Sequence, residues 1–489
     1  MPNASETKDA PAAIGGVWNI VDHGAAEGGK ADCTKAFAAA IDACTAAGGG
    51  RVLVPAGTYL TGPIHLKDNV DLHLARGSTV LFSTNHDDYP LVHTDYEGLA
   101  AVRCISPLWG EGLRNVSVTG EGTFDGQGEA WRPVKRFKMT DEQWDQLTSK
   151  PGSVIDENEL WWPTGRALTG RAHMAELEKQ QKAAASDQPL PPEHYEPARV
   201  YLRPNMVKLT RCRGVLLDGP TFRNSPAWNV HLLLCENVQI RNVNILNPWF
   251  SSNGDGLDLD SCRNVVLENS HFDCGDDAIC IKSGKDEEGR KRGVPCENVV
   301  VQNCTVLHGH GGVTIGSEMS GGVRNIRVVN CVFKGTDIGL RFKSTRGRGG
   351  TVEDVEISNV AMHDVKHEAI SLNLYYWVTT PKPEPKSERT PVFRQFTFRN
   401  ITVAGAERAL EIRGLPESPI ENMLFENFRC RAKSGILISD AKDITLSRVR
   451  LQIDDFPATQ VHNVTNLCMT DVAAEGPTEP LSGKRVGDL

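Results

Sequence analysis

Six side chains that could take part in acid–base chemistry stand in four short segments in the middle of the chain. They are Asp255, Asp276, Asp277, His310, Arg341 and Lys343. Two carboxyl groups suit the hydrolysis of a glycosidic bond, in which one protonates the leaving oxygen and the other activates a water molecule. Crowding of carboxylates raises the pKa of at least one, which would keep one acid protonated near the working pH. An arginine and a lysine beside them would bind a carboxylate on the sugar.

Each of these residues also has an ordinary structural interpretation. An Asp-Asp pair in a turn is more often solvated than catalytic, and a single histidine is more often a hydrogen-bonded structural residue. Arg341 and Lys343 would normally form a solvated strand face, and Asp258 and Asp260 are interpreted as structural. The interpretation as a functional site therefore depends on whether the fold brings the six side chains together.

Two sequence phrases repeat along the second half of the chain. The first is an apolar alternation that ends in asparagine, and its asparagines, from Asn242 to Asn427, are separated by 27, 34, 27, 29, 41 and 27 residues. The second phrase ends in serine, at Ser261, Ser283, Ser317 and Ser344. Short strands at such a period, without helical periodicity between them, predict a solenoid. Two ladders that advance together predict an all-β parallel β-helix, with coils about 4.8 Å apart.

The serines give a register for the six candidate side chains. Counted back from the nearest following serine, Asp255 and Asp277 stand at six residues, Asp276 and His310 at seven, Arg341 at three and Lys343 at one. Because coils stack in register, these side chains are predicted to form one stripe along the solenoid. Adjacent side chains of a strand face opposite ways, so the two neighbouring aspartates reach the stripe together only at a bend, which Gly275 would permit.

Other segments are predicted to cap or interrupt the solenoid. Thr34–Ala47 is alanine-rich and amphipathic, has Asp32 or Thr34 available as its N-cap, and would cover the first coil. Residues 131–200 break the repeat and contain a helix-like run near 171–185, which indicates a partly helical insertion that serves as a lid or cleft wall. The length of 489 residues alone suggests about three domains. The repeat instead predicts a single domain, residues 1–489.

The composition excludes several classes of function. The net charge is −9, from 53 Lys and Arg against 62 Asp and Glu, and a non-specific nucleic-acid binder needs a basic face. No apolar run reaches the ~18 residues of a membrane-spanning helix. The 13 cysteines contain no CxxC pair, so we expect buried thiols and neither disulfides nor a zinc site. No cofactor and no metal are expected.

The segments that carry the candidates resemble the four ordered motifs of glycoside hydrolase family 28, the polygalacturonases. The matching segments are Asn253-Gly-Asp255, Gly275-Asp-Asp277, Gly309-His-Gly311 and Arg341-Phe-Lys343. The resemblance covers about residues 17–130 and 200–470. It implies a right-handed parallel β-helix and an inverting mechanism without a metal.

The resemblance also implies a role for each residue. Asp276 would be the proton donor, while Asp255 and Asp277 would position and deprotonate the water. His310 would support the acid and the substrate. The substrate would be held by Asn253, by Arg341 and Lys343 at the galacturonate carboxylate, and by a tyrosine beyond the last motif, for which Tyr375 and Tyr376 both qualify.

Two positions depart from the family's pattern, in which Gly254 would be threonine and Phe342 isoleucine. Both departures are mild because the charged positions are intact. Family members that cleave rhamnogalacturonan tend to lack the histidine and the basic pair. The presence of these residues here favours a homogalacturonan bond.

Two stretches, Lys285–Pro295 and Gly316–Gly322, resemble those of exo-acting members. The resemblance therefore implies an exo-polygalacturonase that cleaves α-1,4-galacturonosyl bonds from the non-reducing end of homogalacturonan or oligogalacturonides. The alternatives are an endo-polygalacturonase, a hydrolase of a rhamnogalacturonan-type linkage, a calcium-assisted pectate lyase and a non-catalytic glycan-binding β-helix. The acid-rich stripe argues against the last two.

The expected partner is an acidic polysaccharide or oligosaccharide, polygalacturonate, with no nucleic acid and no membrane, and the protein is expected to be a monomer. Residues 1–7 lack the basic and apolar regions of a secretory signal. A secreted or periplasmic location is expected, with the signal absent from this sequence, and a cytoplasmic location stays open.

Overall fold

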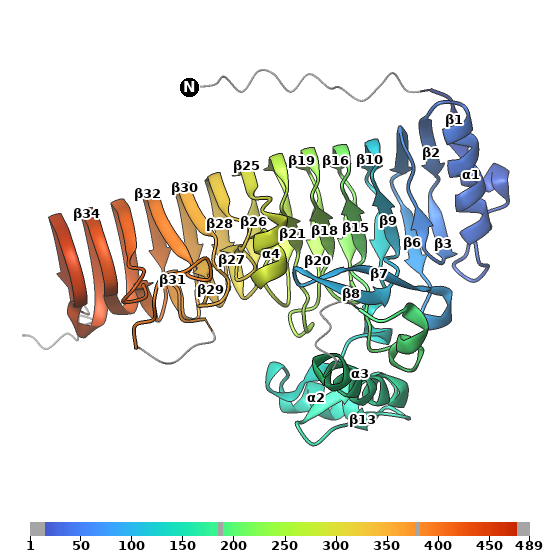
Figure 1. Cartoon of the computed structure of the whole chain (residues 1–489). Helices are drawn as coiled ribbons and strands as arrows, with labels where there is room; N and C mark the ends of the chain where they lie inside the picture. The colour runs from blue at the N-terminus through green and yellow to red at the C-terminus, as the bar shows by residue number, and fades with distance from the viewer. Residues whose placement is uncertain (1–14, 184–188, 377–381, 477–489) are drawn as a thin grey trace, which may run out of the picture.

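The computed structural model describes residues 15–183, 189–376 and 382–476. Its body is one sheet system of 29 strands, and the strands of successive coils pair in parallel. Figure 1 shows these coils stacked from the blue N-terminal end to the red C-terminal end. The all-β parallel β-helix predicted from the repeats is confirmed.

The first ladder, called the site ladder below, carries the stripe of candidate residues. It consists of β4 (Ile64–His65), β9 (Leu108–Glu111), β15 (Val207–Thr210), β18 (Val230–Leu233), β21 (Leu257–Asp260), β24 (Ile279–Lys282), β27 (Gly311–Ile315), β29 (Ile338–Lys343), β31 (Glu368–Asn373), β33 (Arg408–Arg413) and part of β34 (Ile420–Glu475). Leu257 pairs with Ile279, Ile279 with Val313, and Val313 with Leu340. Each of these four residues stands four positions before its serine, so the register predicted from the serines is confirmed.

The second ladder is the one that ends in asparagine. It consists of β1 (Val17–Asn19), β2 (Gly50–Val54), β5 (Val70–Leu74), β10 (Arg114–Gly120), β16 (Arg213–Asp218), β19 (Glu236–Arg241), β22 (Arg263–Glu268), β25 (Cys296–Gln302), β28 (Val323–Lys334), β30 (Thr351–His363), β32 (Val392–Ala404) and β34. Asn359, Asn400 and Asn427 adopt a left-handed backbone at φ 54–56°. Their side-chain amides donate to the asparagine one coil back, over 3.1, 2.9 and 2.7 Å. The asparagines are therefore structural: they close the turns and join the coils.

A third ladder completes each coil and encloses a continuous apolar core. Its strands are β3 (Gly57–Thr61), β6 (Ser78–Phe82), β11 (Thr123–Asp125), β17 (Thr221–Arg223), β20 (Asn244–Leu246), β23 (His271–Asp273), β26 (Thr305–Leu307) and the end of β28. Inward side chains stack on their equivalents in the next coil, as Phe124 does on Phe82 and Phe222, with ring centroids 6.0 and 5.4 Å apart. Such stacking holds the coils at fixed spacing, so that side chains on neighbouring coils keep fixed positions.

The first coil is covered by α1 (Thr34–Ala46), close to the predicted Thr34–Ala47. Phe37 and Ile41 belong to its buried face, which packs on the first strands. The predicted N-cap at Asp32 or Thr34 is wrong, because Cys33 occupies the N-cap position and makes no side-chain capping bond. Asp32 stands one residue earlier and accepts a hydrogen bond from the backbone N–H of Thr34 over 2.9 Å. Within residues 15–183, 189–376 and 382–476, no helix combines the length and the apolar character needed to cross a membrane.

The predicted partly helical insertion, residues 131–200, lies beneath the solenoid in Figure 1. It has a three-stranded antiparallel sheet of β12 (Val134–Lys135), β13 (Val154–Ile155) and β14 (Leu160–Trp162), with α2 (Asp141–Thr148) and α3 (Gly165–Ala183). The helix expected near 171–185 begins earlier because the Thr164 hydroxyl accepts a hydrogen bond from the backbone N–H of Ala167, over 3.2 Å. Residues 184 and 185 lie outside the described residues.

Two further elements lie beside the site ladder. An antiparallel hairpin is formed by β7 (Leu91–Tyr96) and β8 (Leu99–Cys104), and a short helix, α4, spans Asp286–Arg292. Short 3-10 helices occur at Ile20–His23, His86–Asp88, Gly128–Ala130, Arg136–Lys138 and Pro192–Ala198. Twelve of the 13 cysteines are buried free thiols, as expected, and Cys468 is an exposed one.

Candidate active site

The three predicted catalytic carboxyl groups lie together, just before the N-terminal ends of two strands of the site ladder. Asp255 stands two residues before the start of β21, and Asp276 and Asp277 stand three and two residues before the start of β24. Carboxylate oxygens of all three lie within 4.8 Å of one another. This distance is shorter than the roughly 6.5–9.5 Å typical of inverting glycosidases. The inverting mechanism is therefore implied by the family resemblance and not by the carboxyl spacing.

The predicted bend at the Asp-Asp pair is present, but the reason for Gly275 differs from the one expected. Its φ is not in the left-handed region; instead, an added Cβ would lie 2.3 Å from Ser251 Oγ and 2.5 Å from the Pro248 carbonyl oxygen. At Gly254, an added Cβ would lie 1.9 Å from Ser251 Oγ. The segment 248–251 therefore packs on both glycines, and this contact explains why Gly254 replaces the family's threonine.

Gly254→Ala is expected to lower the free energy of unfolding by about 1–3 kcal/mol, the usual cost of overpacking. Ser251→Gly in the same chain should restore most of this stability, because Ser251 supplies the clashing Oγ. That hydroxyl has no hydrogen-bond partner among the described residues, so its removal alone should cost little. Urea unfolding of both single variants and the double variant measures the coupling. Additive effects of the two substitutions would contradict the packing argument.

Asp277 is the most tightly held of the three carboxyl groups. It is buried, and it accepts hydrogen bonds from Arg341 Nη1 over 3.0 Å and from Lys343 Nζ over 2.7 Å. Burial alone would raise the pKa of Asp277, but the charges of Lys343 and Arg341 outweigh it and hold the pKa well below its usual range. The predicted substrate-binding pair thus also keeps Asp277 ionised.

The structure distinguishes the two candidate tyrosines. The ring of Tyr376 lies 4.9 Å from Lys343 Nζ and 5.6 Å from the Arg341 guanidinium carbon. The ring of Tyr375 instead faces Arg346 at 5.6 Å and packs against the solenoid core. Tyr376 is therefore the tyrosine that borders the predicted carboxylate-binding pair.

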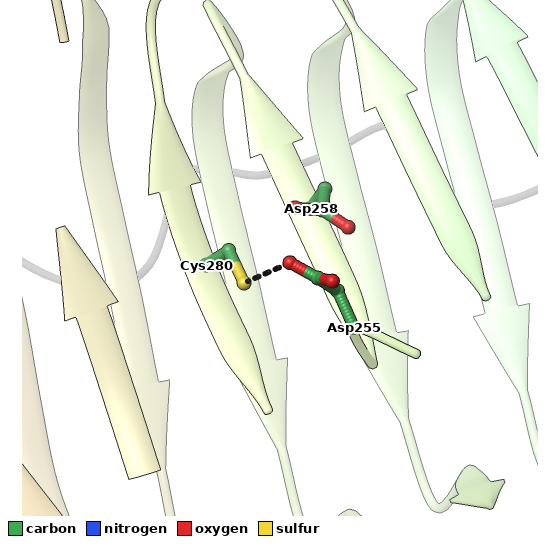
Figure 2. Close-up of side chains that lie close together, drawn as sticks. All are labelled: Asp255, Asp258 and Cys280. Atoms are coloured by element: carbon green, nitrogen blue, oxygen red, sulfur yellow. Dashed lines mark hydrogen bonds between the residues drawn. The ribbon is translucent and has the colours of Figure 1, made fainter. Parts of the chain in front are cut away.

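Asp255 lies in a buried polar cluster that Figure 2 shows in part. Cys280 Sγ donates to Asp255 Oδ2 over 3.7 Å, and Asp258 lies on the other side of the same carboxyl group. Burial, together with the negative charge of Asp276, raises the pKa of Asp255 well above its ordinary value. Of the three clustered carboxyl groups, Asp255 is the one whose pKa is raised. Burial also raises the pKa of Asp258 to about 6.

Lys282 is a buried cation within this cluster that the sequence analysis missed. Its Nζ lies 2.8 Å from Asp258, 3.5 Å from Asp255 and 3.8 Å from Glu318. Its Nζ also lies 3.8 Å from the centroid of the Trp228 ring. The signal was present in the register, because Lys282 stands one residue before Ser283, just as Lys343 stands one before Ser344.

Asp276 is the most accessible member of the carboxyl cluster. Its side chain is 23% exposed, against 6% for Asp255 and 2% for Asp277. His310 Nδ1 lies 2.9 Å from Asp276 Oδ1. Burial would raise the pKa of Asp276, but the hydrogen bond with His310 outweighs it and the pKa is lowered. The residue predicted to donate the proton thus favours its ionised form before substrate binds.

A second missed residue, Lys138, comes from the insertion. Its Nζ lies 2.8 Å from His310 Nε2 and donates to the Gly275 carbonyl oxygen over 2.8 Å. No feature of the sequence pointed to Lys138, because residues 131–200 lie outside the repeat and have no register with the coils. The insertion, predicted to be a lid or cleft wall, therefore reaches the carboxyl cluster through this side chain.

The remaining motif positions are Asn253 and Phe342, and both contact the surrounding structure. Asn253 has a left-handed backbone at φ 53°, and its Oδ1 accepts a hydrogen bond from Arg203 Nη2 over 3.0 Å. This contact fixes the turn that leads into Asp255. Phe342, which replaces the family's isoleucine, points into the core and meets Phe396 edge to face, with ring centroids 5.1 Å apart.

On its N-terminal side, the stripe of candidate residues is covered by other parts of the protein. His231 and Asp258, which stand in register with Cys280, are fully buried. Above them, Tyr96 of the hairpin stacks on Trp228, with ring centroids 5.5 Å apart. Figure 1 shows β7 and β8 crossing the site ladder beside α4.

Two contacts tie that hairpin to α4, within one of the stretches that resemble exo-acting members. Arg292 Nη2 lies 2.5 Å from Asp95 Oδ2, and the backbone N–H of Ala100 donates to Glu288 Oε2 over 2.9 Å. These ionic and hydrogen-bonded contacts join segments nearly 200 residues apart in sequence. The cover over the N-terminal side of the stripe is therefore built into the fold.

Two groups of side chains have the donor types and spacing of a cation site. One is Asp255, Asp276 and Asp277; the other is Asp255, Asp258 and Cys280. Both groups already face cations of the protein, since Lys282 lies against Asp255 and Asp258, and the pair Arg341 and Lys343 lies against Asp277. The counter-charge of the carboxyl cluster is therefore supplied by this chain's own side chains.

Comparisons with known proteins agree with this arrangement. The family model described as "Glycosyl hydrolases family 28" matches residues 198–467. An exo-poly-alpha-D-galacturonosidase from Dickeya chrysanthemi is 30% identical over 473 residues, which cover 93% of this chain and 74% of the relative. An exopolygalacturonase structure from Thermotoga maritima has a TM-score of 0.71 and 32% identity, covering 94% of this chain and 93% of the other.

A family 28 exopolygalacturonase structure from Yersinia enterocolitica has a TM-score of 0.73 and 26% identity, covering 92% of this chain and 78% of the other. The family model spans more than half of the chain and includes all six residues of the stripe. The chain therefore belongs to glycoside hydrolase family 28, the polygalacturonase family.

Proposed function

We propose that this chain is an exo-polygalacturonase, which hydrolyses α-1,4-galacturonosyl bonds of homogalacturonan or oligogalacturonides from the non-reducing end. The observation that carries the proposal is the carboxyl cluster of Asp255, Asp276 and Asp277 beside the cations Arg341 and Lys343. The carboxyl groups supply acid and base, and the cations suit a sugar that itself bears a carboxylate.

In this proposal the three carboxyl groups share one proton. Asp255 holds the proton in the free enzyme, because its pKa is the raised one. When substrate binds, the proton passes to Asp276, the exposed member, which delivers it to the glycosidic oxygen as the bond to the anomeric carbon breaks. A water molecule attacks that carbon and loses its proton to the carboxylates of Asp255 and Asp277. The carboxyl cluster then again holds one proton, as before the reaction.

Arg341 and Lys343 have donors to spare for the substrate. Each donates one hydrogen bond to Asp277, whereas a guanidinium offers five N–H donors and an ammonium three. Contact with a galacturonate carboxylate therefore does not require either side chain to release Asp277. The ring of Tyr376 beside them would complete the wall of this subsite.

The closed N-terminal side of the stripe supports the exo-acting mode. Tyr96, Trp228 and the hairpin lie over the ladder positions next to Asp255, which favours a binding groove that ends on that side. The similar proteins from Dickeya chrysanthemi, Thermotoga maritima and Yersinia enterocolitica are named for exo-acting activity. A groove open at both ends would instead suit cleavage within the chain.

Digestion of a reducing-end-labelled oligogalacturonate is expected to give unlabelled galacturonate from the start of the reaction. The label should move through products that shorten by one sugar at a time. Chromatography of early time points measures this pattern. Labelled products of many lengths at the outset would show endo action, and an unsaturated product that disappears with chelator would show a calcium-assisted lyase.

Three expectations from the sequence stay predictions: single-domain organisation, a monomeric state, and a secreted or periplasmic location. Size-exclusion chromatography with light scattering measures the second. The proposed substrate is a polymer, which favours a location outside the cytoplasm, and fractionation of the source cells measures that location.

A further inference from the structure

Among the described residues of the insertion, Lys138 is the one whose side chain lies within hydrogen-bond distance of an active-site side chain. It ends the 3-10 helix Arg136–Lys138, which leads from β12 toward α2. Its Nζ is held between the Gly275 carbonyl oxygen and His310 Nε2, at 2.8 Å from each. His310 in turn meets Asp276 through its other ring nitrogen, Nδ1, at 2.9 Å. The three side chains form a line from the insertion to the proposed acid.

The chemistry of these contacts fixes where the imidazole proton stands. A lysine ammonium has three donors and no acceptor, so His310 Nε2 must be the acceptor of the contact with Lys138. An imidazole that accepts at Nε2 carries its proton on Nδ1, which then donates to Asp276 Oδ1. An imidazolium would have a proton on both nitrogens and could not accept from Lys138.

We propose that Lys138 is a positioning residue that holds His310 as the neutral Nδ1–H tautomer, so that Asp276 receives a hydrogen bond without a full positive charge. This inference rests on the proposed role of Asp276 as the proton donor. It gives the insertion a part in the reaction beyond that of a wall.

The protonation of His310 matters because it acts directly on the acid. An adjacent imidazolium would favour the carboxylate form of Asp276. A neutral imidazole keeps the hydrogen bond without that charge, so that Asp276, once it has received the proton in the substrate complex, keeps it to higher pH. Lys138 thereby extends the pH range in which the acid, Asp276, is protonated.

Some of the charged groups around His310 favour a second proton on its ring, and others disfavour it. Three acidic groups favour a proton on the ring, and Asp337 Oδ2 lies 3.7 Å from Nε2. Lys366 partly offsets Asp337, with which it pairs over 2.9 Å. The charged groups that interact with the ring are Asp276, Asp277, Asp337 and Lys138. Lys343 acts on Asp276, and Lys366 pairs with Asp337. Among these cations, Lys138 alone is shown in hydrogen-bond contact with the ring.

Lys138→Met should let His310 take a second proton, so the basic limb of the pH profile of kcat should move to lower pH. On the basic side of that limb kcat should fall by roughly tenfold, which corresponds to one unit in the pKa of the acid. KM should change less than kcat, because Lys138 is assigned no contact with substrate. Lys138→Arg, which also only donates, should restore the wild-type profile.

Lys135→Met is the matched control, because it removes an exposed lysine of the neighbouring strand β12 that has no contact with His310. It should leave the pH profile unchanged. A wild-type profile in Lys138→Met would overturn the inference, and so would a change confined to KM, which would make Lys138 a substrate-binding residue. An equal shift in Lys135→Met would also overturn it, because the effect would then be general charge.

A second measurement does not depend on activity. Nitrogen NMR of histidine-labelled protein distinguishes the two neutral tautomers from imidazolium, and His310→Gln identifies the signal of His310. The wild-type protein should show the Nδ1–H tautomer, and Lys138→Met should show a shift toward imidazolium. An unchanged tautomer would overturn the inference. If the wild-type protein fails to hydrolyse oligogalacturonates, the proposed function fails, and this measurement still decides the role of Lys138.

Discussion

Asp276→Asn is expected to lower kcat/KM on oligogalacturonates by roughly 10²–10⁴-fold, the usual contribution of a positioned general acid. The amide has the size of the carboxyl group, and its oxygen can still accept the hydrogen bond that His310 now makes to Asp276 Oδ1. What the variant lacks is a transferable proton. The melting temperature should therefore stay close to that of the wild-type protein.

The chemical specificity of this loss can be measured with a second substrate. An aryl α-galacturonide with a good leaving group needs little protonation, so Asp276→Asn should lose far less activity on it than on oligogalacturonates. Asp273→Asn is a matched control, because Asp273 is a more exposed carboxylate on β23, paired with His308 over 3.1 Å. Equal losses on the two substrates, or full retained activity, would contradict the role of Asp276 as the acid.

Lys282→Met is expected to destabilise the fold by about 3–5 kcal/mol near neutral pH, the usual cost of removing one partner from a buried ion pair. Lys282 is buried, and Asp255, Asp258 and Glu318 all lie within 3.8 Å of its Nζ. Without it these carboxyl groups are left in the interior with less counter-charge. Urea unfolding of the variant and the wild-type protein measures the difference.

The destabilisation by Lys282→Met should shrink as the pH falls. Burial raises the pKa of Asp255 and of Asp258 even with Lys282 present, and the loss of its charge raises both pKa values further. A raised pKa in the folded state means that stability is lost as the pH rises above the unfolded value of about 3.9. Near or below that pH the carboxyl groups are protonated in both states, so wild type and variant should converge.

Lys291→Met provides the control for the loss of one positive charge. Lys291 is 74% exposed and pairs with Glu287 one helical turn away on α4. Such a surface pair contributes little to stability, because solvent screens the two charges. A comparable loss of stability in both lysine variants, or a loss in Lys282→Met that does not change with pH, would contradict the buried-cluster account.

The features predicted from the sequence are those that the repeat fixes. Val238 and Val265 open successive asparagine phrases and pair in the second ladder, as Leu257 and Ile279 do in the site ladder. A period set by stacked coils converts sequence offsets into distances, which is why the carboxyl cluster was predictable. Lys282 obeys the same offset rule as Lys343 and was predictable in the same way.

The features missed by the sequence analysis depend on segments without a repeat. Lys138 reaches His310 from an insertion whose position relative to the coils no offset encodes. The need for Gly275 arises from the segment 248–251, whose close approach is a tertiary contact. The register places Lys343 and Asp277 on the same face of the solenoid. Which carboxyl group Lys343 contacts, however, depends on side-chain geometry that the register does not give.

The most direct test of the central claim is the stereochemistry of the nascent product. If Asp276 donates the proton while Asp255 and Asp277 direct a water molecule in a single displacement, hydrolysis of an α-linked oligogalacturonate must invert the anomeric carbon. Proton NMR during digestion should therefore show β-galacturonate first, followed by its slow mutarotation. An α-anomer at the outset would show retention, and an unsaturated sugar would show elimination, and either result would contradict the account.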